Sequence, residues 1–408
     1  MMMYEEKENF ILEVIPYNLK QSLTSVDSII YKDKKLRCDY LIDIISNIFI
    51  LSNIRNNDGF KIQATTYKKR YGAYYNYYIQ YMIDNDIIKL KKNYFVGVNP
   101  RIYILNPHVA NDTISFYKNI NKNLIKKKIT CPTSFNPHNN IDDDIKHMMV
   151  DDLYKVSIDY DKALKILSDD GDDTCKNSIT TYMIETIKND EWFYHFDNYG
   201  RLHTNITILK SQIRDNCLKI NNNEIVGFDI KNSQPFFFTK FLSDYIKKDS
   251  ETIDHQELIQ YFNDTKNGIL YDKFVGLSYT LNKRVVKITD RKMAKKIIYK
   301  VLFGKNVGAY YDVLFSSFYP TIYKAIKKYK QKNDYKSIAQ MLQRIESNLI
   351  FNNIIREIKN INPNINLFTV HDSIYVELQY NDVVKKIFNN NIKSFFDEQL
   401  KKINRIKK

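Results

Sequence analysis

The amino-acid sequence predicts an α+β fold, and three observations support that prediction. From Cys38 onwards, segments with apolar residues at helical spacing alternate with short apolar runs that end at turn signals. Two pairs of these short runs are separated by tight turns, which indicates antiparallel hairpins. No internal repeat and no low-complexity tail stands out. The expected elements are therefore helices and small antiparallel sheets, which alternate along the chain.

Length and composition fit a folded protein of two or three domains. The chain has 408 residues, of which 44% are hydrophobic and 27% charged, a balance typical of folded rather than disordered chains. Its net charge of +15 favours a polyanionic partner, nucleic acid first and an anionic membrane surface second. The competing interpretation is that AT-rich coding raises the lysine content everywhere.

Targeting and redox features predict a cytoplasmic protein without a membrane partner. No apolar run approaches the roughly 20 residues needed to cross a bilayer, and the polar, acidic N-terminus predicts no signal peptide. The cysteines are scattered without a CxxC pair, which suits a reducing compartment and argues against a zinc site. They are Cys38, Cys131, Cys175 and Cys217.

Residues 1–37 are interpreted as a leader, and residues 38–106 as the first domain. Within the domain, DYLIDIISNIFILSNIR has helical spacing and ends at the turn signal Asn57-Asp58-Gly59. A second helical stretch is broken near Gly72, and two short strands follow around a turn at Gly97–Pro100. Helices followed by a β-hairpin in about 70 residues resemble a winged helix-turn-helix domain.

The resemblance implies contacts with duplex DNA, in which cations on the second helical stretch and on the wing would meet phosphates. The expected ligand is an origin or terminus duplex. The alternative is a winged helix used only for protein contacts or packing. The candidate DNA-binding residues are Lys68, Lys69, Arg70, Lys91, Lys92 and Arg101.

Residues 107–140 are rich in Asn, Lys and Pro without periodicity, and we interpret them as a linker. Residues 141–200 form a helical region that opens with an acidic stretch. Its carboxylates do not fall on one face, which favours a solvated helix surface over a metal site.

Two aspartates in the C-terminal half stand next to apolar runs. Asp229 follows the run IVGF, which has the composition of a buried strand, and precedes a turn signal. Asp372 lies at the tip of a hairpin predicted for INLFTVHDSIYVEL, where an unpaired charge would be costly. Carboxylates on rigid backbone suit Mg²⁺. Each aspartate alone is also an ordinary turn residue.

A third segment, TDRKMAKKIIYKVLFGKN, predicts a helix with Asp290 as N-cap and Gly304 after its C-terminus. Side chains four residues apart form one stripe along a helix. The stripe carries two cations and then two aromatic rings: Arg291, Lys295, Tyr299 and Phe303. Such a stripe could follow a triphosphate and then stack on a base, although an amphipathic helix with a basic edge would look similar.

Together, the three segments resemble motifs A, B and C of the family A DNA polymerases and of the related single-subunit RNA polymerases of phages and mitochondria. Asp229 matches motif A, and Val370-His371-Asp372 matches motif C. The stripe from Arg291 to Gly304 matches motif B, with Phe303 in place of tyrosine. The resemblance covers roughly residues 190–408.

The resemblance implies a right-hand polymerase palm with an antiparallel sheet within residues 201–408, helical fingers at about 240–360, and a thumb-like role for 141–200. Two Mg²⁺ ions, replaceable by Mn²⁺, would be held by Asp229 and Asp372 and would activate the primer 3′-hydroxyl and the leaving pyrophosphate. Lys295 would be the proton donor. The DNA primer–template and nucleoside triphosphates would be its partners, and it would act in the cytoplasm or wherever a mobile or viral genome replicates.

The other family positions carry over residue by residue. Arg291, Lys295, Tyr299, Phe303, Gln234 and His371 correspond to nucleotide-binding positions. Arg201 lies in the Gly-Arg segment before motif A. Together with Arg214 and Gly304, it corresponds to family positions that contact the primer or the template.

Three positions bear on the choice of sugar. Gln234 stands where the DNA polymerases carry a glutamate that blocks the 2′-hydroxyl, and Phe303 lacks the hydroxyl that the RNA polymerases use. Both favour deoxynucleotides, whereas Ser373 follows the motif C aspartate as in the RNA polymerases. We expect a DNA polymerase without a proofreading exonuclease. The alternatives are an RNA polymerase or primase on the same fold, and a non-catalytic winged-helix replication initiator or regulator.

Overall fold

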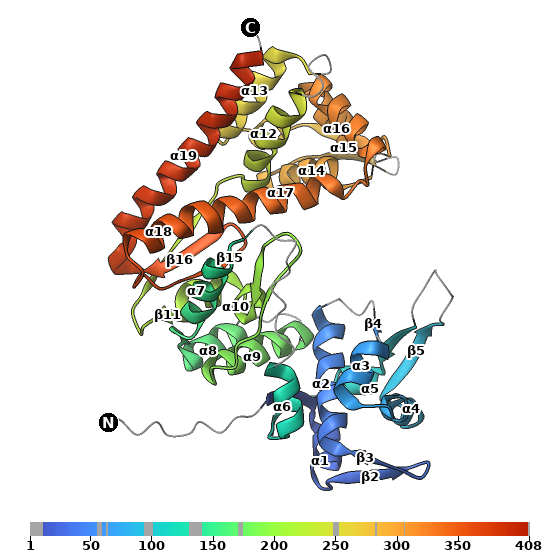
Figure 1. Ribbon diagram of the computed structural model, residues 1–408. Coiled ribbons are helices and arrows are strands. Elements are labelled where there is room, and N and C mark those ends of the chain that lie inside the picture. Colours follow the sequence, from blue (N-terminus) through green and yellow to red (C-terminus); the bar gives the residue numbers. More distant parts are fainter. Residues whose placement is uncertain are drawn as a thin grey trace. The chain divides into compact units, whose positions relative to one another are not determined.

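The computed structural model describes residues 11–54, 59–62, 64–93, 101–129, 141–169, 174–247, 253–281, 284–305 and 307–406. The chain divides into two compact units that are interleaved in sequence. Unit 1 contains residues 1–134, 157–193 and 204–218; unit 2 contains 135–156, 194–203 and 219–408. Both combine helices with small sheets, so the predicted α+β class is confirmed (Figure 1). The expected thumb-like region, 141–200, is divided between the units.

A three-stranded antiparallel sheet organises unit 2. Its strands β12 (Ile225–Asp229), β15 (Leu367–Val370) and β16 (Ser373–Glu377) lie in the order β12-β16-β15. The hairpin predicted around Asp372 is therefore present, with β15 and β16 as its arms. All four residues of β15 are buried, as expected for a strand covered on both faces.

Helices make up most of the rest of unit 2. One long helical run, α17–η2–α18, contains a π-helical segment and lies beside β15 and β16 in Figure 1. The elements are α7 (Asp143–Leu153), α12 (Ser233–Ile246), α13 (His255–Lys266), η1 (Asp272–Phe274), β13 (Ser278–Leu281), β14 (Arg284–Lys287), α14 (Arg291–Phe303), α15 (Tyr310–Phe318), α16 (Pro320–Lys332), α17 (Ser337–Ser347), η2 (Asn348–Ile355), α18 (Arg356–Ile361), η3 (Leu378–Tyr380) and α19 (Asn381–Ile406).

Unit 1 contains, in residues 38–106, the predicted helices and hairpin. The order is α2 (Cys38–Ile54), β4 (Phe60–Lys61), α3 (Ala64–Tyr71), α4 (Tyr75–Asp84), β5 (Ile88–Lys92) and β6 (Ile102–Leu105). The helical stretch breaks at Gly72, whose φ of 87° suits glycine. The strands form an antiparallel sheet in the order β4-β6-β5. The predicted turns at Asn57-Asp58-Gly59 and Gly97–Pro100 lie partly or wholly outside the described residues.

Parts of the expected leader and linker pair with each other in unit 1. Strand β1 (Ile11–Pro16) is antiparallel to β7 (Ile114–Asn119), from Ile11↔Asn119 to Pro16↔Ile114. Every residue of β1 is buried, Glu13 included, and apolar side chains occupy both faces of the strand. These described parts of 1–37 and 107–140 therefore belong to the folded unit.

The remaining elements complete the chain. They are α1 (Tyr17–Thr24), β2 (Ser28–Tyr31), β3 (Lys34–Arg37), α5 (Pro107–Ala110), α6 (Lys122–Ile129), β8 (Val156–Ile158), α8 (Tyr160–Asp169), α9 (Thr174–Lys188), β9 (Tyr194–Phe196), β10 (Leu202–Thr204), α10 (Asn205–Ile208), α11 (Ser211–Cys217) and β11 (Leu218–Ile220). No helix within the described ranges is long and apolar enough to cross a membrane. Cys38 and Cys217 are buried free thiols.

The acidic stretch that was interpreted as solvated surface is partly buried. Asp152 on α7 forms an ion pair with Lys359 at 2.7 Å, and both side chains are about 5% exposed or less. Asp152 also accepts the backbone N–H of Leu367 at 3.1 Å. The prediction was wrong for Asp152, because its position on α7 faces the sheet together with the apolar residues.

Candidate active site

Two aspartates meet at one end of the β12-β16-β15 sheet. Asp229 ends β12, and the register places it opposite Ser373, the first residue of β16. Asp372 immediately precedes Ser373 in the turn that joins β15 to β16. Ser373 Oγ donates a hydrogen bond to Asp229 Oδ1 at 2.8 Å. The pairing of the strands thus brings both sequence-predicted metal ligands together on rigid backbone.

Two negative charges lie at this sheet end. Partial loss of hydration, followed by the negative charge of Asp372, raises the pKa of Asp229, although Ser373 and Lys295 oppose the rise. His371, next to Asp372, has a φ of 57°, a left-handed conformation that is costly for a residue with a side chain and recurs at functional sites. The site therefore combines two carboxylates with a turn in a left-handed conformation.

Helix α14 carries the predicted stripe. Asp290 caps its N-terminus by accepting the backbone N–H of Met293 at 2.8 Å, as the sequence predicted. Lys295 Nζ lies 5.3 Å from the centre of the Tyr299 ring, and the Tyr299 and Phe303 rings meet edge to face at 5.3 Å. Three of the four stripe residues are thus consecutive neighbours on one helix edge.

Electrostatic effects on pKa link this helix edge to the two aspartates. Burial raises the pKa of Tyr299, with Lys295 lowering it and the negative charge of Asp372 raising it further. Lys295 in turn acts on the pKa of Asp229. These charge effects link Lys295 and Tyr299 to the two aspartates, and we group the four residues as one candidate site.

Arg291 begins the stripe with a different set of contacts. Its guanidinium donates to the Gly268 carbonyl at 2.9 Å and to Asp272 at 3.1 Å, and it lies 6.0 Å from the centre of the Tyr271 ring. The Arg291 side chain is 54% exposed, so the ion pair is weak. The guanidinium is therefore accessible to an anion from solvent.

Glu346 joins two predicted residues that are far apart in sequence. It receives a bidentate ion pair from Arg201, at 2.7 and 2.8 Å, and a hydrogen bond from Gln234 Nε2 at 2.9 Å. The Glu346 side chain is 1% exposed. Burial raises its pKa, Arg201 opposes this, and Asp372 adds to the rise. Arg201 and Gln234 are therefore held together by one buried carboxylate.

A histidine pair lies next to the same turn. The rings of His203 and His371 are 6.3 Å apart at their centres, and His203 Nε2 lies 3.2 Å from Asp197 Oδ2. Burial opposes ionisation of Asp197, but bonds from His203 and from the backbone of Tyr199 and Arg201 lower its pKa overall. His203 is thus oriented by a carboxylate that stays ionised.

The donor set fits a divalent metal only in part. Among the described residues, no group of three or more His, Cys, Asp or Glu side chains is arranged to hold a metal ion. Asp229 and Asp372 supply two carboxylates whose mutual repulsion a cation would relieve. Mg²⁺ commonly uses one or two carboxylates and takes its remaining ligands from water and substrate phosphates, so the pair is compatible with Mg²⁺ or Mn²⁺.

Two predicted primer or template contacts have structural partners. Gly304 follows α14 in an extended conformation, with φ −79°, and a Cβ there would lie 2.5 Å from the Lys300 carbonyl. Glycine is therefore required at position 304 because a side chain would collide with the Lys300 carbonyl, and not because the backbone is left-handed. Arg214 lies in unit 1 and donates to the Leu209 carbonyl.

The candidate DNA-binding residues of unit 1 fall into two groups. Lys68 and Lys69 on α3, Lys91 and Lys92 on β5, and Arg101 before β6 are all exposed. Arg70 differs, because its guanidinium pairs with the buried Asp43 at 2.5 and 2.7 Å. Asp43 also accepts the Tyr71 hydroxyl. We therefore treat Arg70 as a structural residue and remove it from the candidate DNA face.

Glu346 and Lys330 are the residues that sequence reasoning missed. Glu346 follows Ile338 and Leu342 at intervals of four residues, and both of these are fully buried. A glutamate on the apolar stripe of α17 was the available signal, since buried carboxylates need partners. Lys330 donates to the carbonyls of Val301 and Gly304 at 2.6 and 2.7 Å, at the end of α14.

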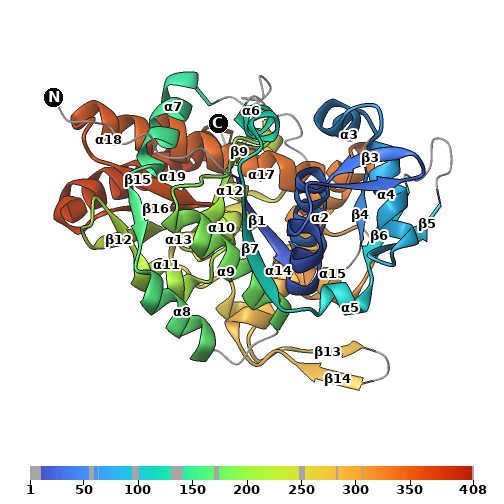
Figure 2. The same cartoon turned by 90° about the horizontal axis from the view of Figure 1, so that it is seen from below.

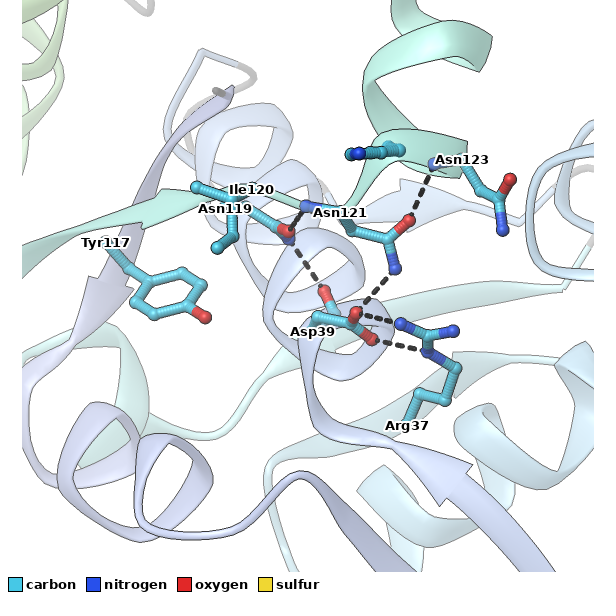
Figure 3. A pocket seen from close by; sticks show the side chains of 8 residues that line it. Arg37, Asp39, Tyr117, Asn119, Ile120, Asn121 and Asn123 are labelled. Atoms are coloured by element: carbon cyan, nitrogen blue, oxygen red, sulfur yellow. Dashed lines mark hydrogen bonds and ion pairs between the residues drawn. The ribbon is translucent and has the colours of Figure 1, made fainter. Parts of the chain in front are cut away.

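Unit 1 also contains a polar cavity of about 360 Å³. Its lining side chains bond mainly to one another (Figure 3). Arg37 forms an ion pair with Asp39 at 2.6 Å, and Asn121 donates to the same carboxylate at 2.5 Å. Because these groups satisfy each other, we assign the cavity a structural role.

The sequence matches no protein-family model, and no curated protein matches it. What the protein does must therefore be inferred from the site itself.

Proposed function

We propose that unit 2 is a template-directed nucleotidyltransferase, a compact DNA polymerase without a proofreading exonuclease. The observation that carries the proposal is the meeting of Asp229 and Asp372 at one sheet end, with Lys295 close enough to shift the pKa of Asp229. Two carboxylates at one end of a sheet, with a cation that acts on one of them, are a combination that metal-assisted phosphoryl transfer can use.

Each residue has a defined task in this proposal. Asp229 and Asp372 would hold divalent ions, and Ser373 would fix the orientation of the Asp229 carboxylate. Bound Mg²⁺ or Mn²⁺ would supply Lewis-acid chemistry for the triphosphate and the primer 3′-hydroxyl. Lys295 would hold a proton at Nζ for the leaving pyrophosphate, and Arg291 would exchange Asp272 for a phosphate oxygen.

The preference for deoxynucleotides depends on Gln234. Its hydrogen bond to Glu346 holds it in one position, which supports a role as a fixed barrier to the 2′-hydroxyl. Ser373 favours the RNA polymerase or primase alternative. Primer extension with deoxy- and ribonucleotides separates the two. Gln234→Gly is expected to raise ribonucleotide use at least about tenfold, equal to about 1.4 kcal/mol.

The central test is incorporation of labelled nucleotides on a primed template. With Mg²⁺ or Mn²⁺, wild-type protein should extend the primer, and Asp372→Ala should lower the rate at least about a thousandfold, or about 4 kcal/mol. Asp244→Ala is the matched control, because this carboxylate is 48% exposed and pairs with Lys240 on the same helix. Absence of any incorporation by wild-type protein, together with DNA binding, would favour the non-catalytic initiator or regulator.

We also propose that residues 38–106 are a winged helix that binds an origin or terminus duplex. The order α2-β4-α3-α4-β5-β6 and the antiparallel β5–β6 pair support it. Lys68→Ala with Lys69→Ala should weaken duplex binding in a fluorescence anisotropy titration. Lys385→Ala with Lys386→Ala, on the exposed face of α19, removes equal charge and should bind as wild type does.

A further inference from the structure

The segment around α14 carries far more positive charge than the proposed nucleotide site uses. Residues 278–311 contain nine lysines and arginines and a single acidic residue, Asp290. The segment comprises the β13–β14 hairpin, α14 and the start of α15. A solvated surface of mixed sign is usual, so this one-sided composition indicates a polyanionic partner.

Helix α14 has a second basic edge beside the one that carries Arg291, Lys295 and Tyr299. Lys292, Lys296 and Lys300 recur every four residues and are all exposed. Each follows Arg291, Lys295 or Tyr299 by one residue, which places the second edge about 100° around the helix axis from the first. The two edges therefore address different ligands or different parts of one ligand.

The second edge leads to a pair of stacked tyrosines. The rings of Tyr279 on β13 and Tyr310 on α15 are 4.0 Å apart at their centres and inclined by 5°. Lys300 Nζ lies 2.9 Å from the Tyr310 hydroxyl and 5.7 Å from the centre of the Tyr311 ring. The lysine row thus ends at half-buried aromatic rings that come from two other elements, β13 and α15.

The hairpin extends this surface. Strands β13 and β14 are antiparallel, with Tyr279 opposite Val286, and they project from the helices of unit 2 as an arm in Figure 2. Arg284 and Lys287 on β14 are exposed, and Val285 between them is 76% exposed. An exposed apolar side chain therefore lies between two cations on this strand.

We propose that this face, formed by the second edge of α14, the Tyr279–Tyr310 pair and the β13–β14 hairpin, binds single-stranded DNA. A row of lysines can follow phosphates, and aromatic rings with exposed apolar side chains can accept unpaired bases. The proposal rests on the proposed function for the identity of the strand, the unpaired template ahead of the site. Binding itself needs no nucleotide and no synthesis.

The test is fluorescence anisotropy with a labelled oligothymidylate about 20 nucleotides long, at several salt concentrations and without nucleotides. Lys292→Ala with Lys296→Ala should lower the slope of log affinity against log salt by about 1.4, since each phosphate contact contributes about 0.7. The matched control is Lys385→Ala with Lys386→Ala, which should leave the slope unchanged. If both double variants lowered the slope equally, binding would depend on nonspecific charge and not on this face. That result would overturn the assignment.

The tyrosines test the stacking part separately. Tyr310→Ala should weaken binding about tenfold at constant salt slope, while Tyr310→Phe, which keeps the ring and removes the hydroxyl bonded to Lys300, should bind as wild type does. Circular dichroism checks that each variant is folded. Unchanged binding in Tyr310→Ala, or tighter binding of the matching ribo-oligonucleotide, would overturn the proposal.

These measurements distinguish failure of this inference from failure of the proposed function. Suppose that the protein incorporates nucleotides on a primed template and that every variant binds oligothymidylate as wild type does. The protein would then be a polymerase whose template strand binds elsewhere. Binding that depends on these residues, without incorporation, would keep the DNA-binding face and reject the catalytic role.

Discussion

At the level of single residues, Glu346 is the side chain on which the geometry of the site depends most. Its side chain is buried, forms the bidentate ion pair with Arg201 and accepts a hydrogen bond from Gln234 Nε2. Glu346→Gln would leave the Arg201 guanidinium without a charged partner in a poorly hydrated place. We expect a loss of about 3 kcal/mol in the free energy of unfolding, measured by urea titration.

The control for Glu346 is Glu398→Gln on α19. Glu398 pairs with Lys402 one helical turn away and is 60% exposed, so its loss should change stability by less than about 0.5 kcal/mol. If the two substitutions had the same effect, Glu346 would not hold the site together.

In the absence of metal, the ionised carboxylate of Asp229 should lower the free energy of unfolding of the protein. Partial desolvation and Asp372 raise its folded-state pKa, so the contribution of Asp229 to stability is largest at low pH and is lost as pH rises through that pKa. Asp229→Asn should therefore be more stable than wild type at pH 7, by a few tenths of a kcal/mol because solvent screens the site. The gain should shrink as pH falls towards about 4.

Mg²⁺ provides the complementary measurement on Asp229. Binding to the folded state alone raises the thermal midpoint, so Mg²⁺ should stabilise wild-type protein and not Asp229→Asn. The exposed Asp244→Asn should respond as wild type does. Equal stabilisation of all three proteins would place the ion elsewhere.

At the level of elements, the C-terminal end of α14 depends on a lysine from α16. Lys330 is buried and donates to the carbonyls of Val301 and Gly304, groups that the helix itself leaves unbonded. Lys330→Met should cost about 1–2 kcal/mol in the free energy of unfolding. Lys332→Met, exposed on the same helix, is the control and should be nearly neutral.

The pH dependence of this cap has a defined sign. Burial lowers the pKa of Lys330 to about 8 from an ordinary value of 10.5. Between these values the unfolded chain binds the extra proton, so wild-type protein should gain stability relative to Lys330→Met as pH rises from about 8 to 10. A difference that stayed constant over this range would contradict the assignment.

Local elements were predictable from sequence where the signals were local. The cap at Asp290, the break at Gly72 and the hairpin around Asp372 each depend on residues within one or two turns. The pairing of β1 with β7 was not predictable, because its partners are about 100 residues apart and each run alone fits a leader or a linker. Likewise, the burial of Glu346 depends on Arg201, which sequence spacing does not reveal.

At the level of the whole molecule, the chain has two units built from interleaved segments. Unit 2 has its own core, which gathers residues from Ile141 to Ile403, and unit 1 buries a separate set that includes Leu41 and Met82. Units with separate cores can unfold in separate steps. We therefore expect two transitions in denaturant and not one.

The single tryptophan allows the two transitions to be assigned. Trp192 belongs to unit 1, so its fluorescence follows that unit, whereas circular dichroism follows the helices of both. Asp43→Asn, which breaks the buried pair with Arg70 in unit 1, should shift the fluorescence transition to lower urea. Asp152→Asn, which leaves Lys359 unpaired in unit 2, should shift only the second part of the dichroism curve, by about 3 kcal/mol.

The double variant Asp152→Asn with Lys359→Met should recover most of that loss. It removes the unpaired ammonium, while the asparagine oxygen still accepts the Leu367 N–H that Asp152 accepts in wild type. If Asp43→Asn and Asp152→Asn each shifted both signals equally, the units would unfold as one cooperative body. In that case, changes at the sheet end of Asp229 would act on the candidate DNA face of unit 1 through a shared folding equilibrium, and binding and synthesis could not be altered separately.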